Sequence, residues 1–214
     1  MAQYRLYQSA PMPNTSAFDN PPITVGLQFT VTTQVRLMAI LWWQATTGAS
    51  LDDRTVGLYT TNDGITGSLI NGIKTQAVSG TGWQTVTLDT PITLAPGKYI
   101  AAVFHPTGQY SVIGDYYIAG GAGYGGGAGI TTNEITVPSV LNAPNGRQNV
   151  FAYSNYFSFP HEMYSGGMYG IDILVDNGPV PPAPDMHVYD GNAWRGGHLH
   201  VYNGTAWVSG APSP

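Results

Sequence analysis

Apolar and polar residues alternate with a period of two along much of the first 176 residues, which is the pattern of half-buried β-strands. In residues 27–31, Leu, Phe and Val alternate with Gln28 and Thr30, so we expect one dry face and one wet face. Residues 35–43 are apolar on both faces and predict a central strand. Further strands are predicted at residues 55–60, 68–70, 83–88, 92–94, 98–104 and 169–175. Helical periodicity is hard to find.

Turn-forming sequences separate these segments, at Asn62-Asp-Gly64, Asn71-Gly72 and Ala95-Pro-Gly97. Seven or more short strands at a spacing of roughly ten residues predict an all-β fold. The expected architecture is an antiparallel β-sandwich of jelly-roll or immunoglobulin-like kind, and the sequence leaves the choice between these two topologies open.

Glycine dominates residues 114–130. Such a stretch buries few side chains and loses much conformational entropy when it becomes ordered, so we predict a long surface loop that continues irregularly to Gln148. Gly121, Gly123 and Gly126 match the pattern G-x-G-x-x-G. A dinucleotide site would need a helix directly afterwards, whereas more glycine follows here, so we interpret the match as chance.

Residues 177–185 contain four prolines and predict a semi-rigid polyproline II spacer. The chain is therefore expected to consist of a β-sandwich domain at residues 1–176, this linker at 177–185, and a separate C-terminal segment at 186–214.

The C-terminal segment contains a duplicated motif, His-Val-Tyr-(Asp/Asn)-Gly-(Asn/Thr)-Ala-Trp, at residues 187–194 and again at 200–207. Asp190-Gly191 and Asn203-Gly204 favour type I′ turns, so each copy predicts a short β-hairpin. With two-residue turns, the first hairpin would pair Tyr189 with Asn192 and His187 with Trp194.

Arms of three or four residues are too short for a hairpin to be stable alone. We therefore expect the pair of hairpins to bind another molecule, either copies of this chain, with a trimer favoured, or other proteins. The residues expected to mediate this assembly are His187, Val188, Tyr189, Trp194, His200, Val201, Tyr202 and Trp207. A choline-type aromatic cage between the repeats is a less favoured alternative.

Charged residues make up 9% of the chain and the net charge is −5. No basic stripe is present to neutralise phosphates, which argues against nucleic-acid binding. The absence of cysteine excludes disulfides and thiol chemistry. No apolar run has the length of a signal peptide core or a membrane span, so neither secretion through a leader nor membrane insertion is expected.

Sites for catalysis, cofactors or metals are not recognisable. No nucleophile, base and orienting group occur at a known spacing, so we expect no catalytic residues, no cofactor and no enzymatic activity. His198 and His200 would share one face of a strand and are weak candidates for metal binding, but both are explained as surface residues of the repeat. Asp172 and Asp176 form an equally weak cation signal.

Aromatic residues fall into two groups. Trp42, Trp43 and Trp83 lie inside apolar strands and are expected in the core. Tyrosines with glycine, serine and asparagine neighbours are typical of binding loops, so we expect either ligand contacts or contacts with sister subunits from Tyr110, Tyr116, Tyr117, Tyr124, Tyr153, Tyr156 and Tyr164.

Residues 1–178 resemble an uncharacterised β-sandwich domain of minor tail proteins of actinobacteriophages and of some actinobacterial surface proteins. The matching stretches are Ile23-Thr-Val-Gly-Leu-Gln-Phe29, Arg54-Thr-Val-Gly-Leu-Tyr59, Gly82-Trp-Gln-Thr-Val-Thr-Leu88, Leu94-Ala-Pro-Gly-Lys-Tyr-Ile-Ala-Ala-Val-Phe-His105, Leu141-Asn-Ala-Pro-Asn145, Phe159-Pro160 and Tyr169-Gly-Ile-Asp-Ile-Leu-Val175. The duplicated motif is similar to short repeats at the ends of phage virion proteins. This chain has Tyr169-Gly170 where the resemblance predicts Tyr-Trp.

The resemblance implies a bacteriophage virion structural protein, in first place a minor tail or tail-tip fibre component that displays the sandwich for contact with the host surface. A capsid decoration or head-fibre protein is the first alternative, and a carbohydrate-binding module that contacts a host cell-wall glycan is the second. A virion protein is made in the host cytoplasm without a signal peptide, which agrees with the N-terminal sequence.

Overall fold

The computed structural model describes residues 3–7, 12, 16–46, 50–114, 116, 129–132, 134–138, 148–163 and 166–178, and the backbone of four short strands between residues 187 and 209. Tyr117, Tyr124, Tyr164 and His198 lie outside the described residues, as do Gly121, Gly123 and Gly126. The chain divides into two compact units, residues 1–178 and 179–214. The first unit thus ends two residues beyond the predicted domain end at Asp176.

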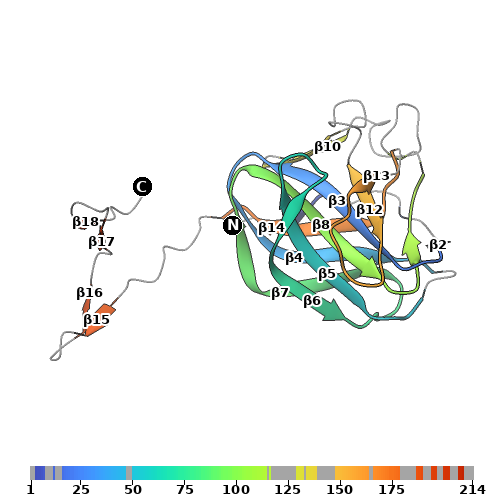
Figure 1. Ribbon diagram of the computed structural model, residues 1–214, viewed down its shortest axis with the longest axis horizontal. Helices are drawn as coiled ribbons and strands as arrows, with labels where there is room; N and C mark the ends of the chain where they lie inside the picture. Colours follow the sequence, from blue (N-terminus) through green and yellow to red (C-terminus); the bar gives the residue numbers. More distant parts are fainter. Residues whose placement is uncertain are drawn as a thin grey trace. The chain divides into compact units, whose positions relative to one another are not determined.

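The first unit is an antiparallel β-sandwich (Figure 1), which confirms the predicted fold class. The smaller sheet has the order β1-β14-β4-β7. Its strands are β1 (Gln3–Arg5), β14 (Ile171–Asp176), β4 (Val35–Gln44) and β7 (Gly82–Leu94). The two chain ends of this unit therefore meet in one sheet, where β1 pairs with β14.

The larger sheet has the order β10-β11-β3-β8-β5-β6, and β12 pairs with both β3 and β13. Its strands are β10 (Gly129–Thr131), β11 (Ile135–Pro138), β3 (Ile23–Val31), β8 (Gly97–His105), β5 (Arg54–Thr61), β6 (Gly67–Gln76), β12 (Asn149–Tyr153) and β13 (Glu162–Met163). β12 pairs with the first half of β3, and β11 pairs with the end of β3.

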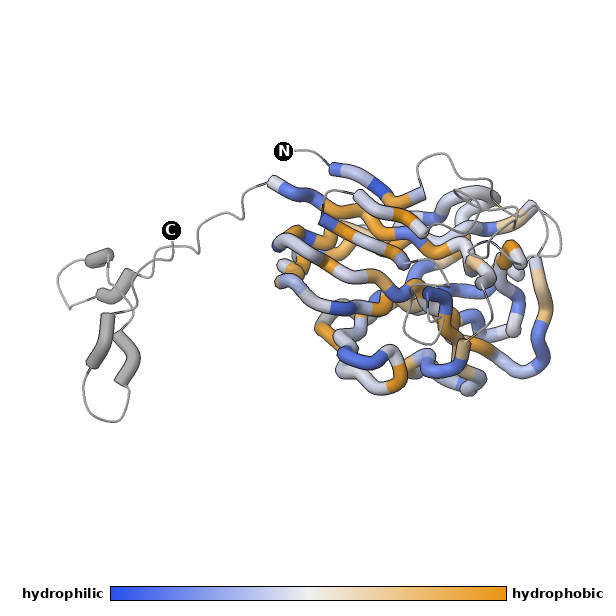
Figure 2. The backbone as a smooth tube through the Cα atoms, turned by 90° about the horizontal axis from the view of Figure 1, so that it is seen from above, coloured by the Kyte–Doolittle hydropathy of each residue, from blue (hydrophilic) through white to orange (hydrophobic). Residues whose placement is uncertain are grey.

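Alternating side chains of both sheets fill the core between them. On β3, Val25, Leu27 and Phe29 are almost completely buried in this core, and on β14 the same holds for Ile171 and Ile173. Figure 2 shows hydrophobic positions recurring along the strands of this unit. The period-two pattern identified these strands because one face of each is turned into an apolar interior.

The three tryptophans expected in the core do not share one environment. Trp42 is fully buried in the core, and Trp83 is partly buried against it. Trp43 is only half-buried and makes an edge-on contact with Trp83 at a ring distance of 5.6 Å. Trp43 follows Trp42 on the same strand, so its side chain points to the opposite face, and its assignment to the core was wrong.

Two turn and loop predictions are corrected. The segment predicted as irregular from residue 114 to 148 contains β10 and β11, whose residues Ile130, Ile135 and Val137 are buried in the core. These strands are too short to show a clear alternation in the sequence. Asn71-Gly72 does not end a strand, because β6 continues through it with an irregular register opposite Val56 and Leu58. Pairing with β5 on both sides of Asn71-Gly72 overrides the local turn preference.

A strap formed by residues 154–160 covers part of the outer face of the larger sheet. Phe157 stacks on Tyr59 at a ring distance of 5.6 Å, and Phe159 meets the same ring edge-on at 5.1 Å. Gly57 makes room for the strap, since a Cβ there would lie 2.7 Å from Cζ of Phe157. These rings form a second, smaller apolar cluster with Ile100 and Val150.

The second unit contains two separate two-stranded sheets, as the duplicated motif predicts. β15 (His187–Tyr189) pairs with β16 (Trp194–Gly196), and β17 (His200–Tyr202) pairs with β18 (Trp207–Ser209). The predicted register was wrong. Tyr189 pairs with Trp194 rather than with Asn192, and His187 pairs with Gly196, so four residues rather than two connect the strands. Tyr202 and Trp207 pair in the same way.

Candidate functional site

A pocket lies at the end of the sandwich where three short elements meet. β2 (Ser16–Phe18) pairs with β9 (Gln109–Ser111), and β12 ends nearby at Tyr153. Asp19 directly follows β2, and its amide donates to the carbonyl of Gly108 at 2.9 Å. Gly108 has a φ of 71°, a left-handed conformation that glycine adopts readily. The turn before β9 can therefore approach Asp19 closely.

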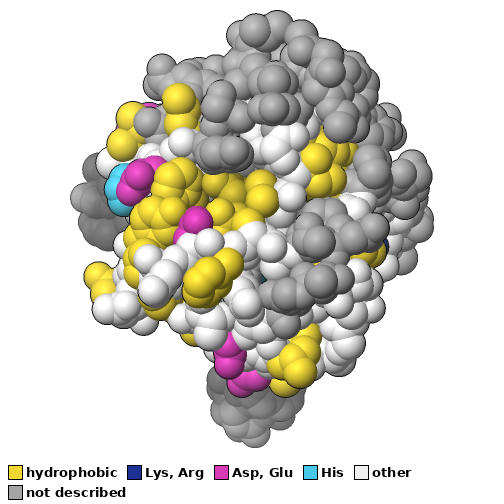
Figure 3. Space-filling view, turned by 90° about the vertical axis from the view of Figure 1, so that its right-hand side faces the viewer, with side chains coloured by type: hydrophobic (Ala, Val, Ile, Leu, Met, Phe, Trp, Pro, Cys, Tyr) yellow, Lys and Arg dark blue, Asp and Glu magenta, His cyan; other side chains and the backbone are white. Residues whose placement is uncertain are grey.

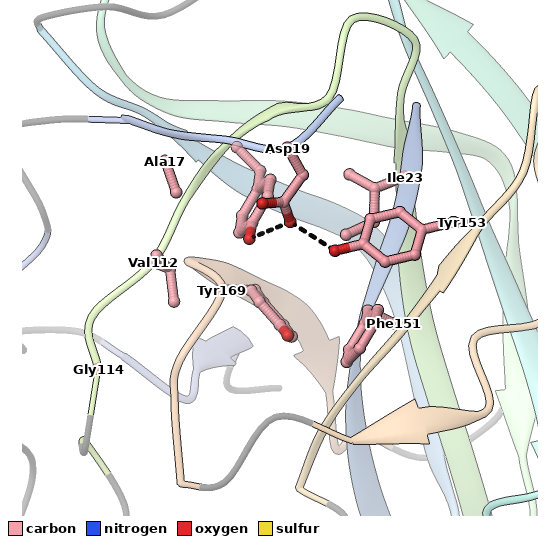
Figure 4. A pocket seen from close by; sticks show the side chains of 9 residues that line it. Ala17, Asp19, Ile23, Val112, Gly114, Phe151, Tyr153 and Tyr169 are labelled. Carbon is pink, nitrogen blue, oxygen red and sulfur yellow. Dashed lines mark hydrogen bonds between the residues drawn. The ribbon is translucent and has the colours of Figure 1, made fainter. Parts of the chain in front are cut away.

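Two tyrosine hydroxyls converge on the carboxylate of Asp19 (Figure 4). Tyr110 Oη donates to Asp19 Oδ2 at 2.7 Å, and Tyr153 Oη donates to the same oxygen at 2.9 Å. The two tyrosines come from β9 and β12, so the carboxylate connects strands that do not pair with each other. Hydrogen bonds to an ionised acceptor are stronger than neutral ones, which holds both rings in place.

Aromatic rings form two walls of the pocket. Tyr110 and Tyr169 are in edge contact at a ring distance of 5.5 Å, and Phe151 and Tyr153 are in edge contact at 5.4 Å. Figure 4 shows Tyr169, Phe151 and Tyr153 around the space below Asp19. The remaining described lining residues are aliphatic side chains and a glycine, namely Ala17, Ile23, Val112 and Gly114. The pocket has a volume of about 320 Å³.

The electrostatic character of the pocket is set by Asp19. No described Lys, Arg or His forms an ion pair with this carboxylate. Partial burial, together with the hydrogen bond to Asp19, raises the pKa of the Tyr153 hydroxyl, so it stays protonated and remains a donor. Behind the pocket, the buried His105 ring lies 6.2 Å from Tyr110. Burial and the neighbouring Arg54 hold the pKa of His105 well below its usual range, so this ring is neutral.

Exposed aromatic side chains occur in the chain segments that contain pocket residues. Phe18 and Tyr156 are 63% and 71% exposed, and Tyr153 itself is nearly half exposed. Figure 3, which faces the pocket end of the sandwich, shows a hydrophobic area with carboxylates set into it. Clusters of this kind on a soluble domain are typical of contact surfaces. We refer to Phe18, Tyr153 and Tyr156 as the aromatic end.

The structure places the predicted contact tyrosines in different environments. Tyr110 and Tyr153 are brought together in the pocket, and Tyr156, three residues after Tyr153, is exposed. Tyr116 is completely buried and makes an edge contact with Tyr7 at 6.2 Å, so its prediction as a contact residue was wrong. The pocket residues Asp19, Phe151 and Tyr169 were not predicted.

The carboxylates of Asp172 and Asp176, which the sequence suggested as a weak cation site, accept hydrogen bonds from protein donors instead. The buried Asp172 accepts hydrogen bonds from Arg5 Nε and from the amides of Leu6 and Tyr7, at 3.0, 3.0 and 3.3 Å. Asp176 accepts hydrogen bonds from the Arg36 side chain and from the backbone amide of Gly178. Within the described part of the chain, no group of three His, Asp or Glu side chains could hold a metal ion. Only the backbone of His200 is described.

The eight predicted assembly residues all lie on the four short strands of the second unit. Their side chains are outside the described residues, so the assembly role stays a prediction. Over the part of the chain that the structure covers, there is no helix with the length and hydropathy needed to cross a bilayer.

Residue 170 marks the departure from the Tyr-Trp pair that the resemblance predicts. Gly170 has a φ of 62°, and a Cβ there would lie 3.0 Å from Cβ of Trp43. Trp43 thus occupies the space beside residue 170, and a tryptophan at that position would require Trp43 to move. Tyr169, the other member of the pair, is retained as a wall of the pocket.

Comparisons with known proteins give one family and distant matches among solved structures. The sequence profile of a family described as "Domain of unknown function (DUF4082)" matches residues 9–171. No curated protein matches the chain. Among solved structures, a clostridial cysteine protease, Cwp84, after propeptide cleavage is similar with a TM-score of 0.46 and 16% identity. The match covers 83% of this chain and 40% of the protease chain.

Proposed function

The chain belongs to the DUF4082 family, and from that starting point we propose that it is a non-enzymatic structural protein of a bacteriophage virion. In this proposal it is a minor tail or tail-tip fibre component. The sandwich is displayed for contact with the host surface, and residues 179–214 attach it to its assembly. The virion setting rests on the sequence resemblance described above.

The single observation that supports the contact role is the exposure of the aromatic end, of which Tyr153 also lines the pocket. Aromatic side chains contribute strongly to binding when they are buried at an interface, and Tyr is enriched among such residues. Phe18 and Tyr156 are exposed to water, and exposed apolar surface has an unfavourable hydration free energy. A binding partner that covers these side chains removes that cost.

A binding role without catalysis fits the chemistry of the pocket. Its described lining residues include one carboxylate and two hydroxyls that already donate to it. Hydrolases often use a Ser, Cys, Thr or Lys nucleophile or a His base, and none of these residue types occurs among the described lining residues.

The attachment role is supported by the second unit. Its described strands are each three residues long, and isolated hairpins of this size are marginal in water. In the proposal, these hairpins are completed by copies of the same chain, with a trimer favoured, or by other virion proteins.

Binding of the fluorescently labelled full chain to actinobacterial host cells tests the contact role. We expect wild-type protein to bind, and the double variant Phe18→Ser with Tyr156→Ser to bind much less. The matched control is Ile65→Ser, which removes an exposed hydrophobic side chain from the turn after β5. Equal binding of all three proteins would contradict the proposal. Labelled antibody on intact particles then distinguishes a tail position from a head position.

A further inference from the structure

The pocket at the aromatic end combines one negative charge with aromatic walls. Asp19 is the only charged residue among its described lining residues, and four of the other eight are aromatic. No described amide, guanidinium or imidazole side chain lines it. The pocket therefore offers ring surfaces, one carboxylate and three tyrosine hydroxyls, two of which donate to that carboxylate.

The hydrogen bonds within the pocket leave its negative charge available. Both tyrosine hydroxyls donate to Oδ2 of Asp19, and no described donor contacts Oδ1. A carboxylate has about four acceptor positions, so Asp19 can accept further hydrogen bonds. Because the hydroxyls of Tyr110 and Tyr153 are already used, they are poorly placed to donate to a neutral ligand.

These features favour a cation over a neutral polyhydroxylated ligand. Sugars are usually held by several planar polar side chains that bridge their hydroxyls, and Asp19 is the only such side chain among the described lining residues. The faces of aromatic rings attract organic cations through the ring quadrupole, more strongly when water is excluded. A carboxylate at the rim adds direct charge complementarity.

We propose that this pocket binds an organic ammonium group, with the cation against the rings of Tyr110, Phe151, Tyr153 and Tyr169 and its charge beside the carboxylate of Asp19. The inference rests on the proposed contact function, since it names the chemical group that the aromatic end recognises on a surface. A volume of about 320 Å³ lies at the lower end of ligand pockets. The proposal covers both a trimethylammonium headgroup and a primary ammonium such as a lysine side chain.

Isothermal titration calorimetry with the full chain tests the proposal with four probes. These are choline, its neutral isostere 3,3-dimethylbutan-1-ol, Nα-acetyl-lysine amide and methyl glucoside. We expect at least one ammonium probe to bind at least about tenfold more tightly than the neutral isostere. Preference for choline indicates a quaternary headgroup, and preference for the lysine derivative indicates a primary amine. Binding of methyl glucoside alone, or failure of both ammonium probes to bind more tightly than the neutral isostere, would overturn the proposal.

Two substitutions locate the binding. Asp19→Asn keeps the shape of the side chain and is expected to weaken ammonium binding about tenfold or more. The matched control Asp89→Asn removes an equal charge from an exposed position on β7, where it pairs with Lys74, and is expected to leave binding unchanged. Circular dichroism and the thermal midpoint verify that Asp19→Asn is folded. If it is not, Phe151→Leu, which removes one aromatic wall, replaces it and should weaken binding of the ammonium probe.

Competition on host cells separates this inference from the proposed function. If the full chain binds cells and saturating ammonium probe does not displace it, the contact function stands and the ammonium inference fails. If the probe binds the protein but the protein does not bind cells, the pocket assignment stands and the contact function fails.

Discussion

Gly108 lies directly against Asp19, so that a Cβ at position 108 would stand 1.7 Å from the carbonyl oxygen of Asp19. The amide of Asp19 donates to the carbonyl of Gly108, and together these contacts set the position of the carboxylate in the pocket. The turn before β9 is thus the element that places Asp19 between Tyr110 and Tyr153.

Gly108→Ala is expected to displace the Asp19 segment and to lower the free energy of unfolding by about 2 kcal/mol or more. The left-handed φ alone costs a non-glycine residue about 1–2 kcal/mol, and the backbone clash adds to it. Urea denaturation measures the loss. The control is Gly80→Ala, where φ is 76° and nothing lies within 4 Å of the added Cβ. Equal destabilisation by both substitutions would mean that the contact with Asp19 contributes nothing.

His105 is expected to make the sandwich less stable in acid. Burial, and then the positive charge of Arg54, hold its folded-state pKa well below 6.5, and the ring of Tyr110 also faces it. Below pH 6.5 the unfolded chain binds a proton that the folded chain excludes, so the free energy of unfolding falls as the pH drops. At pH 5 the contribution is at most about 2 kcal/mol.

Urea midpoints of wild type and His105→Phe, measured from pH 8 to pH 5, test this contribution. The variant should lose less stability over that range than wild type. His161→Gln is the control, because His161 is exposed. A wild-type profile that His105→Phe leaves unchanged would show that His105 is protonated in the folded state.

Asp172 is expected to act in the opposite direction. Burial raises its pKa to about 6, against the favourable effect of Arg5. Between pH 4 and 6 the folded chain retains a proton that the unfolded chain has released. The contribution of Asp172 to the free energy of unfolding therefore increases as the pH falls from 6 to 4, by at most about 3 kcal/mol. This contribution is lost as the pH rises through 6. Asp172→Asn should therefore make the acid loss of stability steeper than in wild type, and an unaltered slope would contradict the raised pKa.

The fit between Gly57 and Phe157 is expected to hold the strap on the larger sheet. In Gly57→Ala the new methyl group would meet the Phe157 ring at 2.7 Å, and crowding in packed regions typically costs about 1–3 kcal/mol. The clash disappears when Phe157 is also changed to Ala. The double variant should thus be more stable than the sum of the two single changes predicts. Strict additivity in urea denaturation would show that the two side chains do not meet.

The long strands could be predicted from the sequence because apolar residues that face the core alternate along each of them, as in β3 and β14. The pocket could not be predicted in this way. Asp19 and Tyr153 are 134 positions apart, and no local pattern shows that β2, β9 and β12 meet at one end. Tyr110 and Tyr153 were found through their loop-like neighbours, but the same signal selected the buried Tyr116. Likewise, the sequence marks Asp172 only as a weak cation candidate, whereas in the structure Arg5 and the segment after it cover this side chain.

The second unit is expected to determine the oligomeric state of the protein. Its hairpins have three-residue arms, and Tyr pairs with Trp in both copies, at Tyr189 with Trp194 and at Tyr202 with Trp207. Cross-strand aromatic pairs stabilise a hairpin by about 1 kcal/mol at most, which is too little for an isolated unit of this size. Sedimentation equilibrium should therefore show an oligomer, with a trimer favoured, for the full chain and a monomer for residues 1–178. The double variant Trp194→Ala with Trp207→Ala should weaken the oligomer without altering the sandwich, because residues 1–178 contain their own core. An oligomer that persists after removal of residues 179–214 would place the assembly contacts on the sandwich instead.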